Sequence, residues 1–282
     1  MRFRWFLCSA LALTLVCAGS ASADQALSSN WSGYVVHRRG VKFTRVYASW
    51  KQPHVRCRRG HASYSAMWVG LGGFAYSSQA LEQVGTEVDC TRAGRTASTA
   101  WIELVPAASE VLRLRVRPGD QLAAQVTVVG HQVTLGLVNL TRHTSFRRSQ
   151  YAQFIDVSSA EWILEAPSVC AGYNDCVSLP LANFRTARFT GAQAQTMSGY
   201  VGTISDQRWN RTQIRLRPTG RRFVVRRGGG TPAGAANPSR LIAGGSSFKV
   251  SFARVFVRLH LRHLPRSPQV RASDLVHAAL AL

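Results

Sequence analysis

Short runs of alternating apolar and polar residues, separated by turn residues, are the feature that most restricts the fold of this 282-residue chain. Successive side chains of a strand point to opposite faces, and many short strands with Gly, Pro, Asn or Asp between them are typical of a β-sandwich or barrel. The runs expected to form strands are residues 33–36, 46–50, 66–69, 101–104, 112–117, 121–128, 133–138, 154–157, 161–164 and 248–252. We therefore predict an all-β chain, with the Gly/Pro/Ala-rich stretch 228–238 as a long loop.

The N-terminus has the order of a secretory signal peptide. Arg2 and Arg4 precede an apolar run over residues 5–16, which is followed by Ala21-Ser22-Ala23. The apolar run is shorter than the roughly 20 residues that a membrane span needs. We predict a signal peptide over residues 1–23, a secreted mature chain without membrane attachment, and one β-sandwich domain over residues 24–258. Residues 259–282 form a basic C-terminal extension with a short helix candidate at 273–282.

Removal of the signal peptide leaves four cysteines, Cys57, Cys90, Cys170 and Cys176. An even number of cysteines in an exported chain predicts disulfides, and four cysteines allow three connectivities. We favour Cys57 with Cys90 and Cys170 with Cys176. No Cys-x2-Cys pair or paired-histidine spacing indicates a metal site, so we expect neither a metal nor another cofactor.

The formal charge of +22 is unusual for a chain of this size, with 35 Lys and Arg against 13 Asp and Glu. Nine of these acids fall between Glu82 and Glu165, so the charges are segregated along the sequence. A basic surface can bind polyanions, but no aromatic-basic interleaving or known motif supports nucleic-acid recognition. We expect a solvated basic face without a specific nucleic-acid partner. Its positive potential is also expected to lower the pKa of Glu165.

Seven motifs occur in an order and spacing that resemble one family, the glutamic endopeptidases (eqolisins, peptidase family G1). The motifs are Asn30-Trp31-Ser32-Gly33-Tyr34, Trp68-Val69-Gly70, Gln83-Val84-Gly85, Ala100-Trp101-Ile102-Glu103 with Pro106, Gly119-Asp120, Ala160-Glu161-Trp162-Ile163-Leu164-Glu165, and the stretch from Cys176 to Phe184. The resemblance extends from about residue 30 to 252. It implies a two-sheet antiparallel β-sandwich of the concanavalin A-like, lectin-like kind. It also implies polypeptide substrates, and we expect a monomer.

The resemblance implies that Gln83 and Glu165 are the catalytic dyad of an endopeptidase active at acidic pH. The two residue types suit this chemistry. A carboxylate such as Glu165 can take a proton from the attacking water and pass it to the leaving amine, while the amide of Gln83 donates a hydrogen bond to the oxyanion. Strand parity places Glu161 on the same face as Glu165, and Gln83 on the face opposite that of Glu82.

Three further residues, Trp68, Glu103 and Glu161, are candidate substrate-binding residues near the dyad. Each also has a plainer interpretation: Trp68 as a core residue, Glu103 as an exposed carboxylate and Glu161 as a structural one. Fungal family members have Asp where this chain has Gly72, and another Asp where it has Ala166. We expect these two departures to change the pH range of activity without removing the dyad.

The alternative function is a lectin-like glycan-binding protein or a glycoside hydrolase on the same sandwich. Glu161 and Glu165 superficially fit the paired carboxylates of laminarinase-type glycosidases, but Ile163 stands where those enzymes have Asp. A regular strand would separate the two carboxylates by about 13 Å, at roughly 3.3 Å per residue. Retaining and inverting glycosidases need about 5 to 10 Å. A lectin without catalytic activity would leave Gln83 and Glu165 apart.

Overall fold

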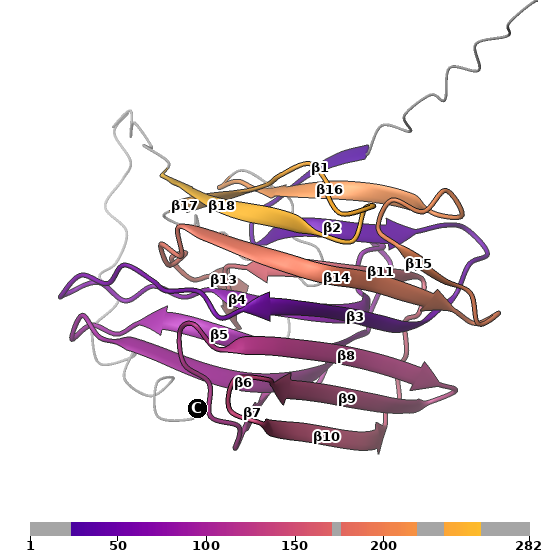
Figure 1. Ribbon diagram of the computed structural model, residues 1–282, viewed down its shortest axis with the longest axis horizontal. Coiled ribbons are helices and arrows are strands. Elements are labelled where there is room, and N and C mark those ends of the chain that lie inside the picture. Colours follow the sequence, from indigo (N-terminus) through magenta and orange to yellow (C-terminus); the bar gives the residue numbers. More distant parts are fainter. Residues whose placement is uncertain (1–23, 171–175, 219–233, 255–282) are drawn as a thin grey trace, which may run out of the picture.

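The computed structural model describes residues 24–170, 176–218 and 234–254, and the regular secondary structure of these residues is entirely β (Figure 1). The predicted signal peptide, the basic extension and its helix candidate lie outside the described residues. Within them, no helix is long and apolar enough to cross a membrane. The strands are β1 Asp24–Ser28, β2 Trp31–His37, β3 Phe43–Lys51, β4 Ala66–Gly72, β5 Leu81–Cys90, β6 Thr96–Val105, β7 Glu110–Leu112, β8 Gln121–Val129, β9 Gln132–Asn139, β10 Thr144–Tyr151, β11 Ser159–Glu165, β12 Ser168–Cys170, β13 Cys176–Ser178, β14 Thr186–Thr196, β15 Val201–Thr203, β16 Asn210–Leu216, β17 Gly234–Pro238 and β18 Phe248–Arg254.

The strands form two stacked layers that are joined along one side. One layer has the order β10-β9-β8-β3-β14-β18, and β17 connects it to the second layer, β16-β2-β11-β4-β5-β6-β7. Figure 1 shows β3, β8 and β9 in front of β4, β5 and β6, and contacts between these strands close the sandwich. The named strands pair antiparallel, except that β1 runs parallel to β16. The predicted antiparallel β-sandwich is therefore confirmed.

Three of the segment predictions are wrong. Residues 113–117 are not a strand, because their backbone pairs with no neighbouring strand. Their alternation arises because the side chains of Leu114 and Val116 are buried in the core. Residues 154–157 form an irregular connection between β10 and β11. Residues 234–238, expected in a loop, form β17, where the small side chains of Ala235 and Ala236 are buried and the backbone pairs with β18.

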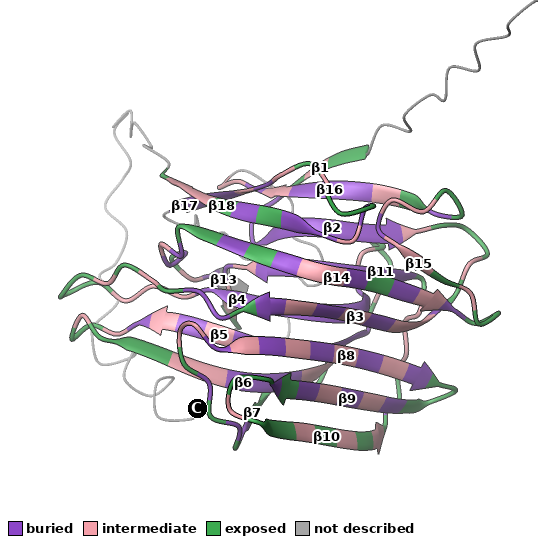
Figure 2. Cartoon of the chain, viewed as in Figure 1, coloured by how far each residue is buried: buried purple, intermediate pink, exposed green. Residues whose placement is uncertain are grey.

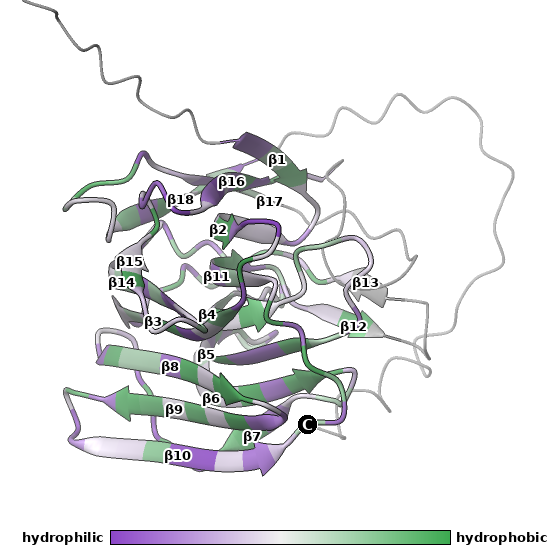
Figure 3. Ribbon diagram, turned by 90° about the vertical axis from the view of Figure 1, so that its right-hand side faces the viewer, coloured by the Kyte–Doolittle hydropathy of each residue, from purple (hydrophilic) through white to green (hydrophobic). Residues whose placement is uncertain are grey.

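The core has two parts, one on each face of the second layer. The larger part fills the space between the layers and includes Trp50, Trp162 and Phe189 (Figure 2). The smaller part lies on the other face and consists of Trp31, Val35, Ala66, Trp68, Leu81, Trp101, Ile163 and Ile214. We call it the outer cluster. Strands β2, β4 and β11 are consequently buried on both faces. Figure 3 shows them from the side, coloured by hydropathy.

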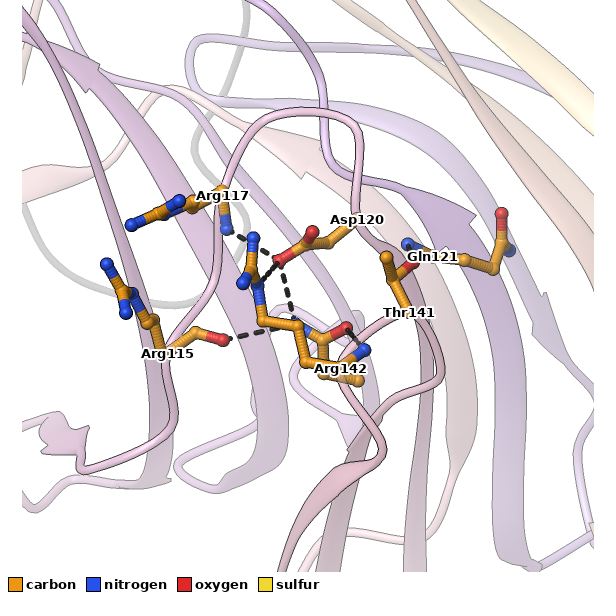
Figure 4. Close-up of polar contacts among 7 residues, drawn as sticks. Arg115, Arg117, Asp120, Gln121, Thr141 and Arg142 are labelled. Carbon is orange, nitrogen blue, oxygen red and sulfur yellow. Dashed lines mark hydrogen bonds and ion pairs between the residues drawn. The ribbon is translucent and has the colours of Figure 1, made fainter.

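The Gly119-Asp120 motif has a structural role in the first layer. Asp120 is 3% exposed, and its Oδ2 accepts hydrogen bonds from Arg117 N at 2.9 Å, Asn139 Nδ2 at 2.8 Å and Arg142 Nε at 2.7 Å (Figure 4). The carboxylate thereby joins the turn before β8 to the turn between β9 and β10. A buried charge that is paired and hydrogen-bonded in this way fixes the geometry of both turns.

One of the two favoured disulfides is present in the structure. Cys57 and Cys90 are bonded, which ties the loop after β3 to the end of β5. Cys170 and Cys176 are direct partners in the register of β12 and β13. Their side chains lie outside the described part of the structure, so their pairing stays a prediction.

The second disulfide can be tested by peptide mapping of the oxidised protein under non-reducing conditions. Because the strand register places the two residues opposite each other, we expect a linked peptide pair containing Cys170 and Cys176. Free, alkylatable thiols at both positions, with the Cys57–Cys90 bond intact, would contradict the prediction.

Candidate active site

Gln83 and Glu165 lie on the same face of the second layer, the face that carries the outer cluster. Gln83 on β5 pairs with Gly70 on β4, and Gly70 pairs with Glu161 on β11. Directly paired residues share a face, as do alternate residues of one strand, so Glu165 shares this face with Glu161 and Gln83. The two candidate dyad residues therefore face the same side of the second layer.

Nitrogen donors surround the carboxylate of Glu165. Trp68 Nε1 donates to its Oε2 at 2.7 Å, and Asn30 Nδ2 donates to its Oε1 at 3.0 Å. The side chain of Trp31 donates a further hydrogen bond. Asn30 is itself held by the Ser28 hydroxyl, which donates to Asn30 Oδ1 at 3.0 Å. The carboxylate is thus fixed in orientation by groups that can only donate to it.

The pKa of Glu165 is raised, not lowered as the basic composition led us to expect. Burial raises it to about 8, and the charge of Glu103 acts in the same direction. The hydrogen bonds from Trp68, Asn30 and Trp31 lower the pKa but do not offset burial. The expectation was wrong because burial of the carboxyl group is the largest influence on its pKa, and no arginine of the described structure is among the groups that shift it.

The amide of Gln83 is oriented by Glu103 on the neighbouring strand. Gln83 is 4% exposed, and its Nε2 donates a hydrogen bond to Glu103 Oε2. Gln83 and Glu103 are direct partners across β5 and β6. Burial raises the pKa of Glu103 to about 7, although the bond from Gln83 lowers it. Gln83 Oε1 is buried and has no partner among the described residues.

Trp68 occupies the space between the two candidate catalytic residues. Its indole N–H reaches Glu165, while the Cζ3 edge of the ring lies against Gly70, the direct partner of Gln83. The ring is fully buried and packs edge-to-face on Trp31, with ring centroids 5.0 Å apart. Trp68 is therefore part of the outer cluster and also a hydrogen-bond donor to Glu165.

Gly85 makes room for this arrangement. A Cβ atom at this position would lie 2.4 Å from the Met67 carbonyl oxygen, 2.6 Å from Trp68 Cβ and 3.1 Å from Trp101 Cζ2. Any side chain on Gly85 would push the Trp68 strand away from β5. The glycine two residues after Gln83 is thus a packing requirement of the site.

Glu161 is placed differently from the other candidates. It is 0% exposed, and neither carboxylate oxygen has a hydrogen-bond partner within the described ranges. Burial raises its pKa well above the usual value. The Ser159 hydroxyl lowers this pKa, and the charges of Asp156 and Glu82 raise it. As a candidate substrate-binding residue, Glu161 offers no accessible surface in this structure.

Two more carboxyl groups lie on the same face, and sequence reasoning missed them. Glu87 pairs with Ala66, which pairs with Glu165, and Asp89 lies two residues further along β5. Burial raises the pKa of Glu87 to about 7 and that of Asp89 to about 8, and the charge of Glu87 further raises the pKa of Asp89. The alternation of acids at 87 and 89 after Gln83 was the available signal. Asn30 and Trp31 were also missed as partners of Glu165, although both belong to a noted motif.

Comparison with known families assigns this β-sandwich to a class of peptidases. Residues 29–219 match the family model described as the Peptidase A4 family, and the chain belongs to this family. The predicted family resemblance is confirmed.

Solved structures show the same fold. Scytalido-glutamic peptidase, solved with a peptide-based transition state analogue, is 21% identical over 80% of this chain and 98% of its own, with a TM-score of 0.62. SCP-B, an eqolisin solved with the tripeptide Ala-Ile-His, is 20% identical over 80% and 98% of the two chains, with a TM-score of 0.58. Aspergilloglutamic peptidase from Aspergillus niger is 21% identical over 68% and 99%, with a TM-score of 0.52. A search of curated proteins found no match.

Replacing Gly85 by Ala tests the packing of the site. We expect Gly85→Ala to lower the free energy of unfolding by about 2–3 kcal/mol, because the added methyl group overlaps backbone and ring atoms. Gly136→Ala is the matched control, since a Cβ on that strand glycine would meet only the Gln125 carbonyl oxygen at 3.9 Å. Chemical denaturation measures both. Equal stability of the two variants would contradict the packing argument.

The buried carboxyl groups predict a protein that is more stable in acid than at neutral pH. A carboxyl with a raised folded-state pKa stays protonated when the unfolded chain ionises, so stability is full below about pH 4.5 and is lost as the pH rises through the folded pKa. Glu82, Glu87, Asp89, Glu103 and Glu165 have raised pKa values of about 7 or 8. We therefore expect the melting temperature to fall between about pH 5 and pH 8. A flat or rising profile would contradict this prediction.

Proposed function

We propose that the chain is a secreted endopeptidase in which Glu165 is the general base and Gln83 stabilises the oxyanion. The observation that carries this proposal is the environment of the two side chains on one sheet face. Glu165 is held by N–H donors from Trp68 and Asn30, and the Gln83 amide is held by Glu103. Family membership supports the reaction class.

The proposed reaction proceeds by direct attack of water on the scissile carbonyl carbon. Ionised Glu165 takes a proton from the water as the new C–O bond forms. The Gln83 amide nitrogen carries two N–H groups, and Glu103 accepts one of them. The other donates to the oxyanion of the tetrahedral intermediate. The C–N bond then breaks, and Glu165 returns the proton to the leaving amine.

The pH range follows from the protonation state of Glu165. A base must be ionised, and the pKa of Glu165 is about 8 in the free protein. Activity should therefore rise as the pH approaches this value, while the loss of stability above neutrality limits it from the other side. We propose an optimum in the weakly acidic range, at the upper end of the acidic range that the family resemblance implies.

The remaining parts of the proposal concern location and partners. Export depends on the predicted signal peptide of residues 1–23. The substrates are polypeptides, in keeping with the family. Absence of a specific nucleic-acid partner and a monomeric state stay predictions from the sequence.

The geometry of β11 counts against the glycoside hydrolase alternative. The strand pairs with β2 and β4 without a register shift, so it has no bulge that would bring Glu161 and Glu165 together. Glu161 is also fully buried. The pair therefore lacks the spacing and access that glycosidic carboxylates need.

Cleavage of a denatured protein by the purified mature chain tests the proposal. We expect Gln83→Ala and Glu165→Gln each to lower kcat/KM by at least about 100-fold, the scale for loss of an oxyanion donor or general base. Glu110→Gln is the control, because Glu110 pairs with Arg148 in an ion pair that includes neither dyad residue. Chelators and serine or cysteine reagents should have no effect. Full activity in either dyad variant would overturn the proposed mechanism.

A further inference from the structure

Asp156 joins the two connections that lead into the strands of Gln83 and Glu165. It lies between β10 and β11, and its Oδ2 accepts hydrogen bonds from the Ser78 hydroxyl and, at 3.1 Å, from Gly73 N. Both donors belong to the connection between β4 and β5. Its Oδ1 accepts the Ser158 N–H at 2.8 Å. One carboxylate thus fixes the starts of β5 and β11 relative to each other.

Gly72 shows how closely this carboxylate is packed. A Cβ atom at Gly72 would lie 2.5 Å from Asp156 Cβ and 2.9 Å from Asp156 Cγ. Gly72 also has a φ of 82°, a conformation that favours glycine. The side chain of Asp156 therefore fills the space that a side chain at position 72 would take. This is the position at which the motif departs from the fungal sequences.

Two buried carboxyl groups lie near Asp156 without cationic partners. Glu82, which precedes Gln83, is 1% exposed; its Oε1 accepts the Asp156 backbone N–H at 3.3 Å and its Oε2 has no partner in the described residues. Glu161 is 0% exposed and has no partner at either oxygen there. An ionised carboxylate in such a place is strongly disfavoured, so Glu82 and Glu161 must be protonated while this packing persists.

No basic group in the described structure forms an ion pair that would stabilise Glu82 or Glu161 in the ionised form. The ion pairs between described residues are Arg142–Asp120 and Arg148–Glu110, and neither includes Glu82, Asp156 or Glu161. His37 pairs with Ser159, which lies between Asp156 and Glu161 in the sequence. Its Nε2 shares a hydrogen bond with Thr212 Oγ1 and its ring packs on Phe74. Burial lowers the pKa of His37, so it stays uncharged near neutral pH.

The titration directions agree with this geometry. Burial raises the pKa of Glu82 to about 8, and the charge of Asp156 adds to the rise. Burial would also raise the pKa of Asp156, but hydrogen bonds from Ser78, Ser158 and Gly73 together lower it. Asp156 is therefore ionised over the range in which Glu82 and Glu161 are neutral.

We propose that Asp156, Glu82 and Glu161 form a proton-dependent latch that holds the start of β5 in place relative to the start of β11, on either side of β4, and opens when Glu82 and Glu161 ionise. Three negative charges that have no ion-pair partner among the described residues then repel one another. The connection between β4 and β5 separates from the segment before β11, and Gln83 moves with its neighbour Glu82. We expect this movement to abolish peptidase activity, an expectation that rests on the proposed function. The opening of the latch itself does not depend on the proposed function.

The latch is tested by neutral amides at the two protonated positions. Glu82→Gln and Glu161→Gln keep the shape of the neutral acid but cannot ionise, and Glu161→Met is a further variant in case an amide packs poorly. Near-ultraviolet circular dichroism, followed from about pH 4 to pH 9 around the carboxyl pKa values, reports the tryptophan packing. We expect the midpoint of the neutral-pH transition to move up by at least about half a pH unit in each single variant. The half-life of the native near-ultraviolet signal after transfer to about pH 8 should lengthen roughly tenfold in each variant.

Glu110→Gln is the control for a change in net charge and should leave the midpoint in place. The proposal is overturned if all latch variants open at the parent's midpoint and with the parent's half-life. The spectroscopic result does not depend on peptide cleavage. A shifted midpoint in a protein that cleaves no peptide would leave the latch intact and refute the proposed function. Cleavage with an unmoved midpoint would refute the latch alone.

Discussion

The hydrogen bond from the Trp68 indole to Glu165 is the contact on which the site depends. It joins a fully buried ring of the outer cluster to the carboxylate that serves as the proposed base. The ring can take this place because Gly85 and Gly70 leave space on either side of it. Packing of the outer cluster therefore sets the orientation of Glu165, and the same burial raises the pKa of Glu165. Stability and chemistry are coupled through one side chain.

Segregation of charge has a clear structural meaning in this protein. The chain carries 35 basic residues, yet the carboxyl groups of the site face have no ion pair with any of them in the described structure. Ion pairs among the described residues therefore do not offset burial, and the site-face carboxyl groups on β5, β6 and β11 share raised pKa values. A site built in this way is stabilised by acid through its fold, whereas the proposed reaction requires the ionised form of Glu165.

Much of the fold was predictable because the sequence pattern directly reflects burial. Alternation predicted the β-sandwich, and Cys57–Cys90 was the favoured choice among pairings that the cysteine count left open. The association of Gln83 with Glu165 came from the family resemblance, and the strand register places both on one face. Segment 113–117 was misassigned because alternation indicates which side chains are buried but not whether the backbone pairs with another strand. Segment 234–238 was misassigned because its glycine and alanine content suggested a loop, although its backbone pairs with β18. The direction of the Glu165 pKa shift is set by burial, which depends on tertiary packing, so composition alone gave the wrong sign. The contact of Asp156 with Gly72 likewise depends on tertiary packing.

The most direct test of the central claim is the titration of Glu165 itself. Carboxyl carbon NMR of glutamate-labelled protein, compared with Glu165→Gln, would assign its resonance and its pKa. The account predicts a carboxyl that titrates near the value of about 8, with the acid limb of kcat/KM following the same transition. A Glu165 that titrates near the ordinary value of about 4.3, or an acid limb that stays in place when Glu165 is replaced, would contradict the assignment of Glu165 as a buried general base.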